Sequence, residues 1–208
     1  MADIIGSKKY EENVFKDFRE KIDGINKKNE FLSPLTITLG DEFQGVLTSL
    51  KQGIEVMMEL EEALMIEGYP FKLRYAIGYG EIMTPINSKI AHGMYGEALT
   101  NTRELLEKSK DEKRKRFDIM LPNNEIEEIF NQLLVVYQSF LDNWKKKDYS
   151  LVGHFIEYKD YKEVAKRVNK LKDQIWRREK SLRIRAYLSQ KEAILILSEM
   201  YQKSLNQV

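Results

Sequence analysis

Three acidic residues in the N-terminal part of the sequence are the strongest candidates for chemistry. Asp3 ends a short apolar segment, and Asp41 and Glu42 follow Gly40 in a tight turn between two segments of alternating apolar residues. Neighbouring strands can bring such carboxylates side by side, and paired carboxylates with backbone carbonyls suit a hard divalent ion. The residues therefore predict a Mg²⁺ or Mn²⁺ site on Asp3 and Asp41, with Glu42 in reserve.

A phosphate-binding turn is expected next to this metal site. After Asp3 the chain runs through Ile5, Gly6 and Ser7 towards a predicted helix at about residues 8–27. Backbone N–H groups and the positive end of a helix bind phosphate oxygens. The combination predicts a nucleoside triphosphate or other nucleotide as ligand. The alternative interpretation is that Asp3 is a surface residue and Asp41 an ordinary turn residue.

The elements that must position these residues alternate between helix and strand. Residues 71–79 alternate between apolar and polar and form the clearest predicted strand, while residues 35–47 read as a hairpin. Helices are predicted at about 49–66 and 96–108, followed by a short strand at 117–121. This order predicts an α+β domain over residues 1–121, in which helices cover a mainly antiparallel sheet.

The chain is expected to be helical after Pro122, so residues 122–208 form a second predicted region. Apolar residues at helical spacing predict a helix from about residue 126 to 144, a long helix over 157–185 and a last helix from Ser189. This region is also basic. Residues 143–187 contain 14 Lys and Arg against 6 Asp and Glu, and the rest of the chain has 20 against 27.

The basic region can neutralise DNA phosphates or face the acidic part of the chain. Its candidate nucleic-acid contacts are Lys170, Lys172, Arg177 and Arg178. The chain has no cysteine and only two histidines, which argues against disulfides, thiolate metal sites and a zinc enzyme. No apolar run approaches eighteen residues and no signal peptide is evident, so we expect a cytoplasmic protein without a membrane partner.

Three segments occur together in an order that resembles known proteins: ADIIGS at 2–7, TLGDEFQG at 38–45 and RYAIGYGEI at 74–82. They resemble the ferredoxin-like palm domain of class III nucleotidyl cyclases and GGDEF diguanylate cyclases. Nearly the whole chain resembles, more closely, the SatD family. The resemblance implies that Asp3 and Asp41 hold metals, that Ile4 lends a carbonyl, and that the residues lining the phosphates are Ile5, Gly6, Ser7 and Gly40.

Departures from the cyclase pattern argue against carrying over an activity. Ile37 stands where class III cyclases place a base-reading lysine, and Leu39 replaces the second glycine of GGDEF enzymes. Thr100 and Glu104 occupy the positions of the cyclase asparagine and arginine, with Asn101 and Arg103 each one position away. No catalytic residue is therefore assigned.

Both ends of the sequence look short beside the family. Only Met1 and Ala2 precede Asp3, too few for a central strand, so either the natural chain begins upstream or Asp3 lies on a frayed end. SatD-like proteins are expected to end in a helix-turn-helix. Residues 187–208 look like its first helix and turn, without a recognition helix.

The sequence thus predicts a SatD-like regulatory protein. Its palm binds a metal–nucleotide complex and is coupled to a DNA-binding tail, and a homodimer is plausible by resemblance. Two alternatives stay open. One is an active nucleotidyl cyclase or nucleotidyltransferase, and the other is an inert structural or adaptor protein.

Overall fold

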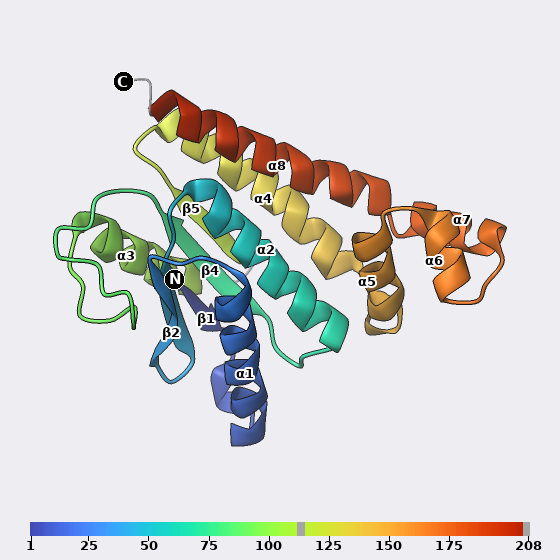
Figure 1. The fold of residues 1–208 in the computed structure, drawn as a ribbon, viewed down its shortest axis with the longest axis horizontal. Coiled ribbons are helices and arrows are strands. Elements are labelled where there is room, and N and C mark those ends of the chain that lie inside the picture. The colour runs from blue at the N-terminus through green and yellow to red at the C-terminus, as the bar shows by residue number, and fades with distance from the viewer. Residues whose placement is uncertain (112–114, 206–208) are drawn as a thin grey trace.

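The computed structural model describes residues 1–111 and 115–205. This part of the chain forms an α+β structure with one five-stranded mixed sheet and eight α-helices (Figure 1). In chain order the elements are β1 (Ala2–Ile4), α1 (Glu12–Lys28), β2 (Ser33–Leu39), β3 (Glu42–Val46), α2 (Leu50–Glu67), β4 (Leu73–Gly78), α3 (Glu97–Asp111), β5 (Phe117–Met120), α4 (Asn124–Asn143), α5 (Tyr149–Tyr158), α6 (Tyr161–Arg167), α7 (Lys172–Ser181) and α8 (Ile184–Leu205).

The sheet has the strand order β2-β3-β1-β4-β5, with β4 and β5 parallel and all other neighbours antiparallel. The shortest strand, β1, lies at its centre. Asp3 is paired with Glu42 of β3 on one side and with Arg74 of β4 on the other. The expectation that this strand is too short for a central position, or that Asp3 lies on a frayed end, is therefore wrong.

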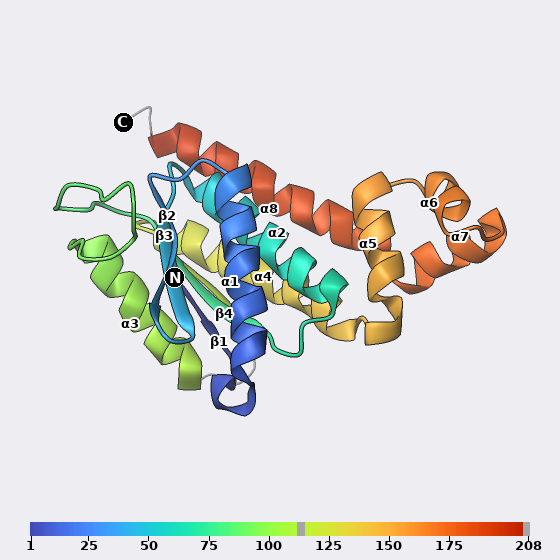
Figure 2. The ribbon, with the colours of Figure 1, turned by 60° about the horizontal axis from the view of Figure 1, so that its bottom comes forward.

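Helices cover both faces of the sheet, as Figure 2 shows: α1 and α2 lie on one face and α3 on the other. On the first face, Phe18 of α1 makes edge-on ring contacts with Phe43 and Phe71 at 5.6 and 5.3 Å. On the second face, a Cβ at Gly78 would lie 1.8 Å from the Thr102 hydroxyl of α3. The close approach of α3 to β4 thus requires a glycine.

The first helix begins later than its apolar spacing predicts. A short 3₁₀ turn, Ser7–Lys9, follows Gly6, whose φ of 71° is left-handed, and α1 begins only at Glu12. Tyr10 has extended backbone angles, which separate the turn from the helix. The positive end of α1 therefore does not lie at residues 5–7.

The predicted helix after Pro122 is confirmed as α4, and α8 packs against both α4 and α2 (Figure 1). Near the start of α8, the ring of Tyr187 has its centroid 5.7 Å from that of Tyr137 and 4.8 Å from that of Trp144. Buried residues of α4 and α8 belong to the same hydrophobic core as the sheet. The division of the chain after Leu121 stays a prediction.

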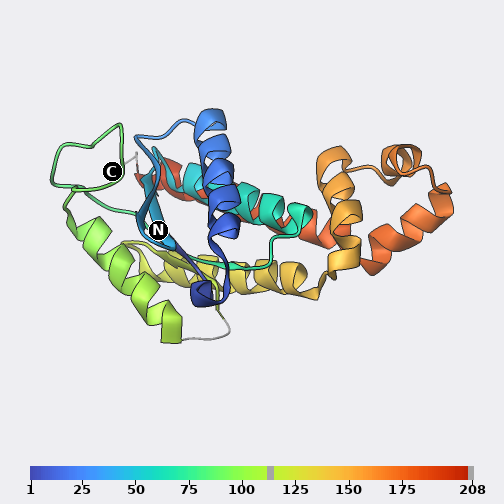
Figure 3. The same cartoon turned by 90° about the horizontal axis from the view of Figure 1, so that it is seen from below.

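The single long helix predicted over residues 157–185 is wrong. The chain there forms the end of α5, then α6 and α7, and α8 already begins at Ile184. The breaks coincide with three residues of positive φ, namely Lys159 at 55°, Asn169 at 50° and Arg183 at 55°. We call residues 149–181, which comprise α5, α6 and α7, the α5–α7 lobe; α6 and α7 lie at one end of the molecule, away from the sheet (Figures 1 and 3).

A helix was expected to begin the segment 187–208, and residues 184–205 form one uninterrupted helix, α8. The end of that segment, residues 206–208, lies outside the described part of the chain, so the predicted turn stays a prediction. In the described part of the chain, no helix combines the length and apolar character that a membrane span requires.

Candidate functional site

The pairing of β1 with β3 and β4 brings the predicted carboxylates together. Side chains alternate across a strand, so Ala2 and Ile4 enter the core while Asp3 points to the opposite face, which α3 covers. Its register partners Glu42 and Arg74 point to the same face. All three are buried, with 5%, 9% and 8% of their surface exposed.

The Asp3 carboxylate forms an ion pair within the protein. Nη1 of Arg74 donates to both carboxylate oxygens of Asp3, at 2.9 and 3.2 Å. Burial raises the pKa of Asp3, against the opposing effects of Arg74 and Lys110, and the nearby carboxylates Asp41 and Glu42 raise it further. The carboxylate is thus anchored in a largely dry position.

Glu42 is bound from α3 by two cations. Lys110 Nζ lies 2.9 Å from Oε1, and Arg103 Nη1 lies 3.0 Å from Oε2. The two cations are seven residues apart, two helical turns, so they project from one side of α3. Burial raises the pKa of Glu42, but the hydrogen bonds from Lys110 and Arg103 outweigh it, so the pKa is lowered.

Asp41 and Gly40 form the tip of the β2–β3 hairpin. Gly40 has a φ of 58° and is exposed, and Asp41 is half-buried beside it. The Asp41 carbonyl accepts a hydrogen bond from the Ile4 N–H at 3.1 Å, which ties the hairpin tip to β1. Asp41 therefore lies near Asp3, as predicted. Its carbonyl is bonded to the residue that follows Asp3, and its carboxylate is close enough to raise the pKa of Asp3.

The predicted phosphate-binding turn is only partly available. The Ile5 N–H donates to the Lys72 carbonyl at 2.9 Å, so it is already used. Gly6 is exposed and Ser7 is half-buried, but no helix of ordinary length begins at either residue. The turn can offer N–H groups to a ligand without the support of a helix dipole.

The carboxylates as arranged fit an ion-pair network better than a metal cage. Both oxygens of Asp3 and both oxygens of Glu42 already face a cationic side chain. Across residues 1–111 and 115–205, no group of three or more His, Asp or Glu is placed to hold a metal ion. A metal would therefore have to displace cations from Glu42 or Asp3.

The α5–α7 lobe presents charge in a different way. Val168 to Leu171 separate α6 from α7 by four residues, and Asn169 takes the left-handed conformation in this turn. Val164, Ala165 and Ile175 are buried between the helices. Two short helices joined by a four-residue turn have the form of a helix-turn-helix pair.

The four predicted nucleic-acid contacts divide into two kinds. Lys170, Lys172 and Arg177 are exposed and have no ion-pair partner within the described residues. Arg178 instead pairs with Asp148 at 2.6 Å, which fixes α7 against the start of α5. Three of the four cations are thus free to meet an external anion, and the fourth positions the helix.

Sequence reasoning missed the partners of the carboxylates. Arg74, Arg103 and Lys110 lie 71, 61 and 68 residues from the groups they bind. The one available signal was the spacing of Arg103 and Lys110. They are seven residues apart, so they fall on the same side of the helix predicted at 96–108 when that helix is extended to Lys110. Nothing in the sequence indicates that this side faces Glu42.

Comparison with families of known proteins gives a match. The family model described as the SatD family matches residues 1–197 of the chain. Neither the curated proteins nor the solved structures contain a match to the chain.

Proposed function

The chain belongs to the SatD family, and we propose that it is a DNA-binding regulatory protein whose α6–α7 pair docks on the double helix. The observation that carries this proposal is the set of unpaired cations at the start of α7. Lys172 is the first residue of α7, Lys170 lies two residues before it, and Arg177 follows on the exposed side of the helix. Helix-turn-helix proteins place the N-terminal part of their second helix in the major groove.

The residues of α7 allow separate roles in such a complex. Lys170 and Lys172 can neutralise phosphates, which supplies affinity without reading sequence. Gln174 and Arg177 are exposed on α7, and their side chains suit adenine and guanine edges respectively. Trp176 of the same helix is 39% exposed, and the Lys180 ammonium lies 3.7 Å from its ring centroid.

Salt dependence of binding to fluorescent duplex DNA tests the proposal. We expect wild-type affinity to fall as salt rises, and the Lys170→Ala/Lys172→Ala variant to lower the magnitude of the log–log slope by about 2, roughly one per cation. Lys8→Ala/Lys9→Ala, which removes two exposed lysines near the N-terminus, is the matched control and should bind as wild type. Equal slopes for all three proteins would refute DNA contact by the lobe.

Metal–nucleotide binding by a ferredoxin-like palm is a second candidate function. Its support is the gathering of Asp3, Asp41 and Glu42 beside Arg103 and Lys110, whose side chains are 40% and 33% exposed. If a metal–nucleotide complex bound these carboxylates, the two cations released from Glu42 would face its phosphates. The strand order β2-β3-β1-β4, with antiparallel neighbours, also supports the palm interpretation.

Calorimetry with Mg²⁺ and ATP or GTP tests this second function. We expect saturable, Mg²⁺-dependent binding by wild type, weakened at least tenfold in Asp41→Ala, because the half-buried Asp41 has no ion pair among the described residues. Absence of binding, or unchanged binding in Asp41→Ala, would leave the palm as a structural unit. Incubation with each nucleoside triphosphate and Mn²⁺ distinguishes turnover from binding, since only an enzyme yields a cyclic or dinucleotide product.

A homodimer is part of the DNA proposal, because helix-turn-helix proteins commonly bind two half-sites one helical turn apart. Sedimentation of the protein with and without duplex DNA measures this directly. A protein that stays monomeric on DNA would restrict the proposal to a single half-site.

A further inference from the structure

The outer side of the α4–α8 pair exposes apolar side chains in regular helical positions. Ile129 and Val136 of α4 and Ile196 and Met200 of α8 are between 44% and 62% exposed. Along α8, the exposed positions 189, 193, 196 and 200 recur at spacings of four and three, which place them on one side of the helix. An exposed apolar surface of this kind marks a contact with another macromolecule. We call the following residues the α4–α8 face: Ile129, Val136, Ser189, Ala193, Ile196 and Met200.

The α4 and α8 parts of this face adjoin. The two helices pack side by side and run antiparallel (Figures 1 and 2). Gln190 Nε2 donates to the Leu133 carbonyl at 2.8 Å, which fixes their register. Ile129, one helical turn before Leu133, therefore lies level with the turn of α8 that contains Ala193. The exposed residues of the two helices thus form one surface rather than two separate stripes.

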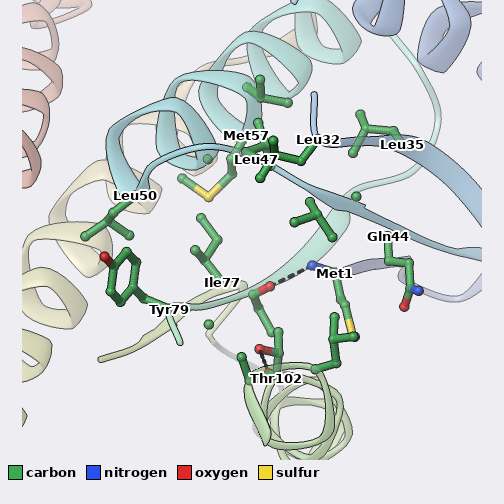
Figure 4. A pocket seen from close by; sticks show the side chains of 18 of the residues that line it. Met1, Leu32, Leu35, Gln44, Leu47, Leu50, Met57, Ile77, Tyr79 and Thr102 are labelled. Atoms are coloured by element: carbon green, nitrogen blue, oxygen red, sulfur yellow. Dashed lines mark hydrogen bonds between the residues drawn. The ribbon is translucent and has the colours of Figure 1, made fainter. Parts of the chain in front are cut away.

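The opposite side of α8 is anchored to the sheet region, which fixes the direction of the face. Gln202 Nε2 donates to the Tyr79 hydroxyl at 3.2 Å, and the Tyr201 ring centroid lies 6.4 Å from that of Tyr79. Tyr79 follows β4 and lines the internal cavity drawn in Figure 4. Turning α8 to bury Ile196 and Met200 in its own chain would break these contacts. The face is therefore covered only when another molecule packs on it.

Side-chain size changes along the α8 part of the face. Ser189 and Ala193 are small and come first, and Ile196 and Met200 are large and follow. A second α8 laid antiparallel across the first, about an axis between Ala193 and Ile196, places Ala193 against Ile196 and Ser189 against Met200. Small residues opposite large ones let two helices interdigitate closely. The α8 surface is thus complementary to an antiparallel copy of itself.

The charges around the face also change sign along it. Exposed Glu125 and Glu128 lie at the start of α4, beside the end of α8, where Lys203 is paired within its own helix. Exposed Arg183 and Arg185 lie at the start of α8, beside the end of α4. Antiparallel pairing of two copies brings the acidic end of one to the basic end of the other, whereas parallel pairing brings like ends together. The charges therefore favour the same arrangement as the side-chain sizes.

We propose that the α4–α8 face is a dimer interface, on which a second copy of this chain packs its own α4–α8 face. The twofold axis is perpendicular to α8 and passes between Ala193 and Ile196, so each contact across the interface occurs twice. The two α5–α7 lobes, which adjoin the start of α8, then lie at opposite ends of the dimer. This interface supplies the homodimer of the DNA proposal, but it forms without DNA.

The cysteine-free chain allows a positional test of this geometry. Single cysteines are introduced as Ala193→Cys, next to the axis, and as Lys203→Cys, and each protein is treated with a short bismaleimide cross-linker. We expect Ala193→Cys to give a covalent dimer. Lys203→Cys should give none, because its two copies lie about 26 Å apart along antiparallel helices. Efficient cross-linking of both variants, or of neither, would overturn the proposed arrangement.

Sedimentation without DNA tests the interface itself. We expect wild type to form a dimer with rising concentration, and Met200→Glu to raise the dimer Kd at least tenfold while its urea denaturation stays as in wild type. Leu171→Glu places the same charge on a similarly exposed apolar residue of the α5–α7 lobe and should dimerise as wild type. A wild type that stays monomeric, or equal dimerisation of Met200→Glu, would refute the interface. Because no DNA is present, neither result depends on whether the lobe binds DNA.

Discussion

The sheet region and the α5–α7 lobe are both rich in charge, but they use it in opposite ways. On the sheet face under α3, the buried carboxylates form ion pairs within the protein: Asp3 with Arg74, and Glu42 with Arg103 and Lys110. The lobe has 9 Lys and Arg against 5 Asp and Glu, and its exposed cations Lys170, Lys172 and Arg177 have no ion-pair partner in the described chain. The contrast indicates that one set of charges stabilises the fold and the other is available to an external anion.

The largest expected effect comes from breaking a buried pair of the sheet region. Arg116 lies 2.9 Å from Glu61, and both side chains are less than a tenth exposed. Arg116→Ala leaves the Glu61 carboxylate buried and uncompensated, so we expect a loss of about 3–5 kcal/mol in unfolding free energy. Urea denaturation measures this loss.

Lys203→Ala is the control for that variant, because Lys203 is 69% exposed and pairs with exposed Glu199. Its expected cost is below about 0.5 kcal/mol. Equal stability of the two variants would show that the sheet region does not depend on its internal ion pairs.

The Met1 amine gives the next largest effect, as a dependence of stability on pH. Its pKa in the folded protein, about 5, lies below the ordinary 8.0, so the unfolded chain binds more protons between these values. Stability should therefore rise by roughly 2–4 kcal/mol from pH 5 to pH 8. Urea denaturation across this range, with Met1 verified by mass spectrometry, measures the slope.

Acetylation of the amino group removes the titration and serves as its control. The acetylated protein should lose most of the rise between pH 5 and pH 8. An identical slope in both proteins would mean that the amine is solvated rather than buried beside the Ala76 carbonyl.

Glu42 gives a smaller effect on the acid side. Its pKa is lowered by Lys110 and Arg103 despite burial, so its contribution is present above the unfolded pKa and is lost as pH falls through the folded pKa. In Glu42→Gln, the unfolding free energy should fall less steeply below about pH 4.5 than in wild type, and it should be about 1 kcal/mol lower at pH 7. A steeper fall of unfolding free energy with decreasing pH in the variant would contradict stabilisation of the ionised Glu42 by Lys110 and Arg103. Denaturant titrations of both proteins from pH 3 to 7 measure it.

The sequence predicted regular elements well where apolar spacing decides them. The strand within residues 71–79, the hairpin and α4 have clear periodicity, and all were confirmed. Residues 157–185 were predicted as one long helix because the breaks at Lys159 and Arg183 carry no glycine or proline; only Asn169 is a residue type that favours positive φ. Tertiary contacts decide these turns, and they are not visible in local sequence.

The candidate site shows the same limit. The nearness of Asp3, Asp41 and Glu42 could be predicted because strand neighbours follow from the order of elements. The ion pairs of these acids could not be predicted. That of Asp3 depends on the register of β1 with β4, and those of Glu42 depend on which side of α3 faces the sheet. A carboxylate pattern therefore predicts where acids gather, and only the fold shows what compensates them.

One paired measurement tests the central contrast most directly: DNA affinity and unfolding free energy of Arg177→Ala and Arg103→Ala, which remove the same charge from the two regions. Arg177→Ala should weaken binding to duplex DNA about tenfold, as loss of one such contact does, with stability unchanged. Arg103→Ala should lower stability by up to about 1 kcal/mol and leave DNA affinity within about twofold of wild type. Equal losses of DNA affinity in both variants, or none in Arg177→Ala, would contradict the account.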